Sequence, residues 1–163
     1  MNNIYSSNLR KGFGIVEAII ASAIISVVLV AIISAYQNLS RLSLQNTENI
    51  QAAFLLEEGG EIVRIMRDNN WSNISSLTNG TTYYATWNGT TWVSTTTPNE
   101  IDVFTRTFVF SNATRDMNFN LSQTEGTEDP NSRLVTVSVS WDNYGNGTTT
   151  KSLQTYIFNT FNQ

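Results

Sequence analysis

The fold is decided by residues 13–36, which read FGIVEAIIASAIISVVLVAIISAY. One charged residue, Glu17, lies near the start of this stretch, and the other polar side chains before Tyr36 are three serines. About 20 apolar residues suffice to cross the hydrocarbon of a bilayer, so the stretch predicts a membrane-spanning helix. A charge well inside hydrocarbon costs about 3 kcal/mol on insertion scales. Glu17 therefore needs both its position near one end of the span and a partner of opposite charge.

The residues directly before this stretch are basic. Arg10 and Lys11 precede Gly12, and all 13 acidic residues of the chain follow it. A secretory signal peptide has a short apolar core and a small-residue cleavage site, and residues 13–36 are too long for that core. An ordinary single-pass anchor fits the length, but it explains neither Glu17 nor the step from Gly12 to the apolar run.

Residues 10–17, RKGFGIVE, resemble the class III N-terminal signal of type IV pilins and of the pseudopilins of type II secretion. The resemblance implies that a dedicated membrane enzyme, the prepilin peptidase, cuts after Gly12 and methylates the new N-terminus at Phe13. It also implies that the Glu17 carboxylate pairs with the Phe13 amine of a neighbouring subunit. The partners implied are the inner membrane, the peptidase and other pilin subunits.

Two positions depart from the family pattern. Gly14 stands where the family usually has a small hydroxyl residue, which leaves the expected processing intact. Ser34 stands where many major pilins carry a helix-bending proline. The second departure predicts an unbroken membrane helix and favours a minor rather than the major subunit.

Composition excludes several functions for the part of the chain that follows the predicted membrane span. The chain has 163 residues and a net charge of −4, enough for one membrane helix and one small outer domain. An acidic outer domain gives no electrostatic reason to bind nucleic acid. The chain contains neither cysteine nor histidine, which excludes Ser–His and Cys–His nucleophile pairs. We therefore expect no enzyme activity and no cofactor, and we assign neither catalytic nor metal-binding residues.

A helical pattern continues beyond the membrane span, over residues 37–70. Its apolar stripe consists of Leu39, Leu42, Ile50, Ala53, Phe54, Ile62, Ile65 and Met66. The charged residues between them, Glu48 among them, are interpreted as a solvated face. Because each glycine costs about 1 kcal/mol in a helix, Gly59-Gly60 predicts a bend or a local loss of regularity.

Residues 71–163 change to Asn, Thr, Ser and aromatic residues and predict an antiparallel β head. Asn88-Gly89 between two aromatic runs indicates a hairpin with a type I′ turn. Alternation predicts two further strands. One carries Phe104, Arg106, Phe108 and Phe110 on one face and Val103, Thr105, Thr107 and Val109 on the other; the second carries Val135, Val137, Val139 and Trp141 on the face expected to join the core. Residues 142–147 predict a second hairpin loop, and residues 122–132 an exposed loop.

Two other interpretations of the head stay open. Calcium prefers oxygen ligands, which Asp142, Asn143 and Asn146, or Glu125, Glu128 and Asp129, would supply, although neither set has a known ligand spacing. The aromatic residues Trp71, Tyr83, Tyr84, Trp87, Trp92 and Tyr144 would form either an adhesive surface or, as we favour, core and cross-strand pairs.

The sequence therefore predicts an α+β, pilin-like fold in four parts. These are a leader (1–12), the transmembrane half of a long helix (13–36), its amphipathic continuation (37–70) and an antiparallel β head (71–163). The basic flank holds the N-terminus in the cytoplasm by the positive-inside rule, so the head lies outside the inner membrane and, after polymerisation, on a surface filament.

Two alternative functions belong to other classes of protein. One is a pseudopilin of a type II secretion or competence system, which forms a short periplasmic piston. The other is a membrane-anchored binding module that does not polymerise.

Overall fold

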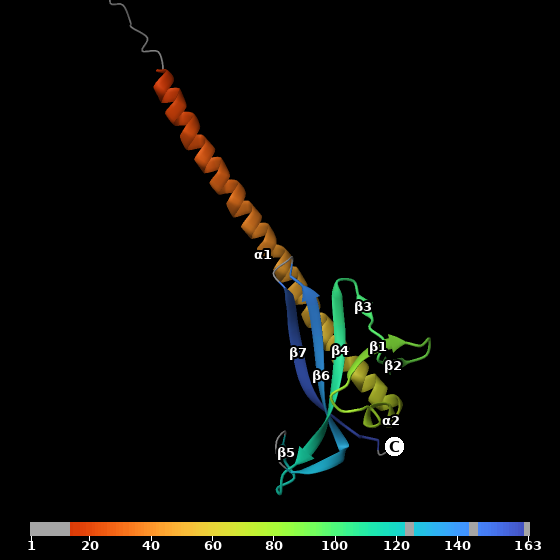
Figure 1. Cartoon of the computed structure of the whole chain (residues 1–163). Helices are drawn as coiled ribbons and strands as arrows, with labels where there is room; N and C mark the ends of the chain where they lie inside the picture. Colours follow the sequence, from red (N-terminus) through yellow and green to blue (C-terminus); the bar gives the residue numbers. More distant parts are fainter. Residues whose placement is uncertain (1–13, 123–125, 144–146, 162–163) are drawn as a thin grey trace, which may run out of the picture. The chain divides into compact units, whose positions relative to one another are not determined.

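The structure is a computed structural model and describes residues 14–122, 126–143 and 147–161. Contacts divide the chain into two compact units, Met1–Leu44 and Gln45–Gln163. Helix α1 (Ile15–Asn69) belongs to both units, and the second unit adds the short helix α2 (Ser72–Ser75) and all the strands (Figure 1).

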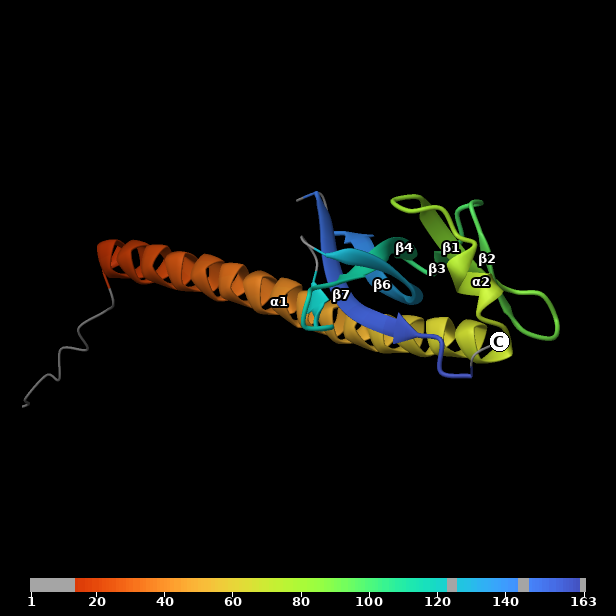
Figure 2. The ribbon, with the colours of Figure 1, turned by 90° about the horizontal axis from the view of Figure 1, so that it is seen from below.

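The strands of the described residues form one antiparallel sheet. They are β1 (Thr82–Trp87), β2 (Trp92–Thr95), β3 (Glu100–Ile101), β4 (Phe104–Arg115), β5 (Leu121–Ser122), β6 (Thr127–Asp142) and β7 (Thr148–Phe158). The sheet order is β2-β1-β4-β6-β7, with β3 and β5 also paired to β4. Figure 2 shows the sheet lying along one side of the C-terminal part of α1. The predicted α+β fold, a long apolar N-terminal helix packed against an antiparallel sheet, is confirmed.

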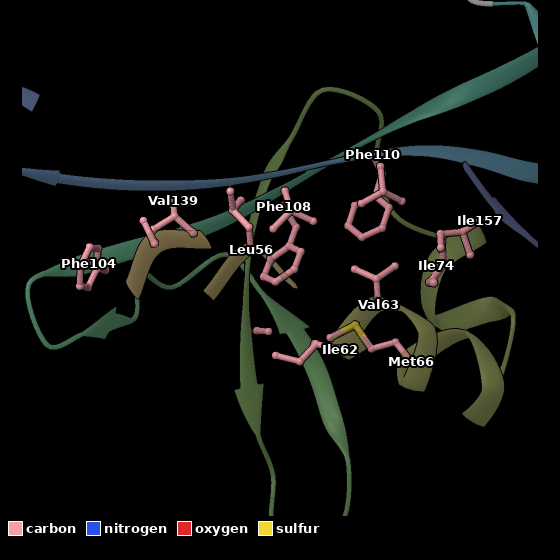
Figure 3. Packing of buried hydrophobic residues seen from close by; sticks show 14 of the residues in the cluster. Leu56, Ile62, Val63, Met66, Ile74, Phe104, Phe108, Phe110, Val139 and Ile157 are labelled. Atoms are coloured by element: carbon pink, nitrogen blue, oxygen red, sulfur yellow. The ribbon is translucent and has the colours of Figure 1, made fainter. Parts of the chain in front are cut away.

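The core of the second unit lies between α1 and the inward faces of β4 and β6. The alternation predicted for both strands is confirmed, because Phe108 and Phe110 on β4 and Val137 on β6 are buried. Figure 3 shows Leu56 and Val63 of α1 among the phenyl rings of β4.

The helix face that meets this core is not the predicted stripe. Ile62 and Met66 are buried as expected, but Ile50, Phe54 and Ile65 are 45–65% exposed, and Ala53 is exposed as well. The buried face of α1 consists of Glu48, Ala52, Leu56, Gly59, Gly60, Ile62, Val63 and Met66. Small residues determine which face of α1 is buried, because they allow the helix to approach the sheet closely. A pattern of large apolar residues does not include them.

Gly59 explains why the predicted loss of helical regularity is absent. Helix α1 is continuous through Gly59 and Gly60, and both residues are buried. A Cβ atom at position 59 would lie 2.6 Å from Val137 Cγ1 and 3.2 Å from Arg106 Cδ. Gly59 is therefore the point of close contact between helix and sheet, and packing there offsets its low helix propensity.

The first hairpin was predicted with the wrong turn. Trp87 pairs with Trp92, so four residues rather than two join β1 to β2. The Asn88 side chain closes this loop, because its Oδ1 accepts hydrogen bonds from the amides of Thr90 at 3.0 Å and Thr91 at 2.9 Å. This side-chain closure replaces the type I′ turn.

The predicted exposed loop at residues 122–132 is largely strand. β6 begins at Thr127, and residues 127–129 pair with β4 beyond a register shift at Asn112/Ala113. An ion pair between Arg115 Nε and Asp129 Oδ2 at 2.6 Å connects this part of β6 to β4. The two residues are too far apart in the sequence for the pair to be predicted.

Candidate membrane and assembly site

In the first unit, α1 carries apolar side chains on every side from Ile15 to Tyr36. From Ile15 to Ile33 its large aliphatic side chains are at least half exposed, and they occur at all angles around the helix. A helix that is apolar all round is stable only where something apolar surrounds it. By length and composition, this helix could span a membrane, since residues 15–36 extend about 33 Å at 1.5 Å per residue against about 30 Å of hydrocarbon.

Two of the three serines of this segment hydrogen-bond to their own helix. Ser22 Oγ donates to the Ile19 carbonyl oxygen at 2.8 Å, and Ser26 Oγ donates to the Ser22 carbonyl oxygen at 2.8 Å. Both hydroxyls are satisfied by their own helix, which lowers the cost of placing them in hydrocarbon.

Glu17 lies in the first turn of α1. Its backbone amide donates to the Gly14 carbonyl oxygen at 3.0 Å, and Ala18 donates to the same oxygen at 3.2 Å. The partial positive charge at a helix N-terminus favours a carboxylate here, typically by 0.3–1 kcal/mol. That is well below the cost of about 3 kcal/mol for a charge deep in hydrocarbon.

No hydrogen bond or ion pair to the Glu17 carboxylate occurs within the described part of the chain. Gly12 and Phe13, the predicted cleavage and methylation site, and the leader charges Arg10 and Lys11 lie outside the described residues. The pairing of Glu17 with a Phe13 amine therefore stays a prediction.

The second unit holds a polar contact where its part of α1 begins. Glu48, predicted on the solvated face, is instead buried, and its Oε2 accepts a hydrogen bond from Trp141 Nε1 at 3.2 Å. Gln45 Nε2 donates to Asn143 Oδ1 at 3.2 Å. These two bonds fasten the end of β6 to the helix.

A second connection crosses the core. Arg106 lies on the inward face of β4, and its side chain is only 3% exposed. Its Nη1 donates to Glu58 Oε2 at 2.8 Å and to the Leu55 carbonyl oxygen at 3.2 Å. An arginine among inward-facing phenylalanines is the sequence signal for such a contact, because a buried guanidinium requires acceptors.

The calcium interpretation gains no support from the described residues. They contain no group of three or more His, Cys, Asp or Glu side chains that could hold a metal ion. Asp129 is already engaged, because its carboxylate accepts from Arg115 Nε and Ser132 Oγ, both at 2.6 Å. Glu125 and Asn146 lie outside the described residues.

Most of the aromatic residues belong to the core or to cross-strand pairs. Trp71 is buried, Tyr83 meets Phe110 edge-on at 6.0 Å between ring centroids, and Trp87 meets Trp92 at 5.8 Å. Tyr144 lies outside the described residues.

Comparison of the chain with protein-family models, with curated proteins and with solved structures found no match. A functional assignment must therefore come from the chain's own residues.

Proposed function

We propose that this chain is the precursor of a minor subunit of a type IV pilus-like filament, with no catalytic role of its own. One observation carries the proposal: an all-round apolar helix segment, with Glu17 as its single charge, continues into the helix that supports an antiparallel head. The sequence RKGFGIVE at residues 10–17 supports it, through its resemblance to the prepilin signal.

The proposed mechanism is assembly. The subunit waits in the inner membrane with its head outside, the prepilin peptidase removes residues 1–12, and the amine of Phe13 is methylated. The apolar segments then leave the lipid and pack against one another in the filament, so their surface stays out of water throughout.

In this filament, Glu17 neutralises the Phe13 amine of the adjacent subunit. Removing either charge leaves the other unpaired in an apolar setting, which is strongly unfavourable. The ion pair therefore favours one axial register between neighbouring subunits. The Glu17 carboxylate has no internal partner in the described residues, which leaves it available for such a contact.

Labelling at the cell surface tests the proposal. The full chain, carrying a C-terminal epitope, is expressed in its own host and probed by immunogold electron microscopy on intact cells. Gold along surface fibres is the expected result. Label that appears only after the outer envelope is opened, on short fibres, identifies a secretion pseudopilus. Uniform label on a membrane that carries no fibres identifies an anchored binding module, and either of these results contradicts the proposal.

A further inference from the structure

The loop between β4 and β5, residues 116–120, holds two large apolar side chains out into solvent. Met117 is 93% exposed, the highest value among the large apolar side chains of the described residues, and Phe119 is 80% exposed. Their neighbours in the loop, Asp116, Asn118 and Asn120, are polar, so the loop presents two apolar side chains in a polar setting. We call Met117 and Phe119 the apolar knob.

The knob is held in place by a network of hydrogen bonds. Asp116 Oδ1 accepts from the amides of Asn118 and Asn120, each at 2.8 Å, and Arg115 Nη1 donates to the Phe119 carbonyl oxygen at 2.9 Å. Phe119 has a φ of +63°, a left-handed conformation that is unfavourable for a residue with a Cβ atom. The hydrogen bonds hold the loop in this strained conformation, and the loop exposes two apolar side chains to water. A rigid loop of this kind indicates a preorganised binding element.

An apolar hollow of about 290 Å³ lies at the opposite end of β4. It is lined by Gln51, Phe54, Leu55, Ile101, Asp102 and Phe104. Phe54, the predicted core residue that proved to be 65% exposed, forms part of it. A cavity of about 150 Å³ holds a benzene molecule, so the hollow has room for a phenyl ring together with a thioether.

The knob and the hollow stand at the two ends of one strand. β4 runs from Phe104 at the hollow to Arg115 at the knob, about 36 Å at 3.3 Å per residue. A knob cannot reach the hollow of its own chain over that distance. Every copy nevertheless carries both halves of a possible contact, in equal number.

We propose that the apolar knob of one copy binds in the apolar hollow of the next copy, which joins the heads head-to-tail. This inference rests on the proposed function in one respect: subunits of a filament all point the same way, so opposite ends of neighbouring heads face each other. A heterologous contact of this kind repeats without limit, as a filament requires. Methionine and aromatic residues are enriched at such contacts.

Both rims carry a carboxylate, Asp102 beside the hollow and Asp116 beside the knob. In the contact these like charges lie near each other, and the Debye length falls from about 30 Å at 0.01 M salt to about 3 Å at 1 M. The contact therefore strengthens as the salt concentration rises, whereas a contact held by ion pairs weakens.

Disulfide trapping tests the contact, because the chain has no cysteine. The full-length variant Gln51→Cys/Asn118→Cys places one thiol on the rim of the hollow and one in the knob loop, at exposed positions. Mild oxidation in the cell envelope should give a ladder of dimers, trimers and longer products on a non-reducing gel. The matched control Thr90→Cys/Asn118→Cys moves the first thiol to the β1–β2 loop and should give no ladder.

Changing Met117 and Phe119 to serine in the Gln51→Cys/Asn118→Cys background should lower the cross-linked fraction about tenfold or more, as expected for the loss of central anchor residues. Intact β-sheet circular dichroism shows that the head has folded. Absence of a ladder while surface fibres are present overturns the knob-and-hollow contact and leaves the proposed function standing. Asn118→Cys alone carries one thiol and can only join two knobs as a dimer; if it cross-links as readily as the double variant, the knobs meet each other and the knob-and-hollow contact is overturned. A ladder without surface fibres supports the contact and contradicts the proposed function.

Discussion

Gly59 sets the separation between α1 and the sheet. The face of α1 that meets the core includes Ala52, Gly59 and Gly60 as well as large apolar residues. Patterns of large apolar residues predict that a helix packs against something, but they do not report how closely. The stripe through Ile50 and Phe54 was therefore assigned to the core, although the close contact at Gly59 turns it towards solvent.

Replacing Gly59 with alanine should destabilise the head by up to about 2 kcal/mol. The added methyl meets Val137 Cγ1, and overpacking typically costs 1–3 kcal/mol, offset by about 1 kcal/mol of helix propensity. Urea unfolding of the full chain in detergent, followed by fluorescence of the buried Trp71 and Trp141, measures the change.

Gly60→Ala is the matched control. Apart from its own helix backbone, no atom of the described residues lies within 4 Å of a Cβ at position 60. The variant should therefore be unchanged or more stable by up to about 1 kcal/mol. Equal destabilisation by both variants contradicts the close contact at Gly59.

Asp129 connects stability to pH. The hydrogen bond from Ser132 is the main cause that lowers the pKa of Asp129 below 3.8; burial opposes it, and Arg115 adds to the lowering. Because the folded pKa is below the unfolded one, the stabilisation is fully present above about pH 4 and is lost as the pH falls through the folded pKa.

Asp129→Asn should therefore lower stability by about 1 kcal/mol at neutral pH. It should also reduce the loss of stability between about pH 5 and pH 2. Unfolding curves across this range, with Asp142→Asn at the exposed end of β6 as the control, measure both effects. An unchanged acid limb in the Asp129 variant would show that this carboxylate does not carry the dependence.

At the scale of elements, β4 connects the features on which the head depends. Its inward face carries Arg106, whose guanidinium meets Glu58 of α1, and its ends carry the apolar hollow and the apolar knob. The strand and its two alternating faces were predictable, because alternation over Phe104–Phe110 is regular. The partners were not, since Glu58 and Arg106 are 48 residues apart.

Glu58→Gln should destabilise the head by about 1–3 kcal/mol, because the buried Arg106 guanidinium loses its carboxylate partner; exposure of Glu58 keeps the effect below that of a fully buried pair. Glu57→Gln, one residue away and exposed, should change stability by less than about 0.5 kcal/mol. Chemical unfolding of the two variants side by side separates this specific contact from a general effect of charge.

Irregular elements were the least predictable from sequence. The extension of β6 over residues 127–129 depends on the Arg115–Asp129 ion pair, and the first hairpin depends on Asn88 accepting two amides. The apolar knob depends on a left-handed Phe119, which no propensity favours. In each case a contact between particular atoms overrides the local pattern.

For the whole molecule, the apolar segment of α1 was fully predictable, because hydrocarbon requires a long uninterrupted apolar run. Its proposed role depends on Glu17. We expect Glu17→Ala to insert in the membrane at least as well as the parent chain, since a cost of up to about 3 kcal/mol disappears, but to lose most surface fibre. Membrane content by immunoblot and fibre yield after shearing measure the two effects, and unchanged fibre yield contradicts the register role.

We propose that the chain is cut after Gly12 and polymerised as a filament subunit. The intact mass of the protein in sheared surface fibres tests it most directly. We expect one species that begins at Phe13 and carries one added methyl group. A species that retains residues 1–12, or absence of the chain from the fibre fraction, would contradict it.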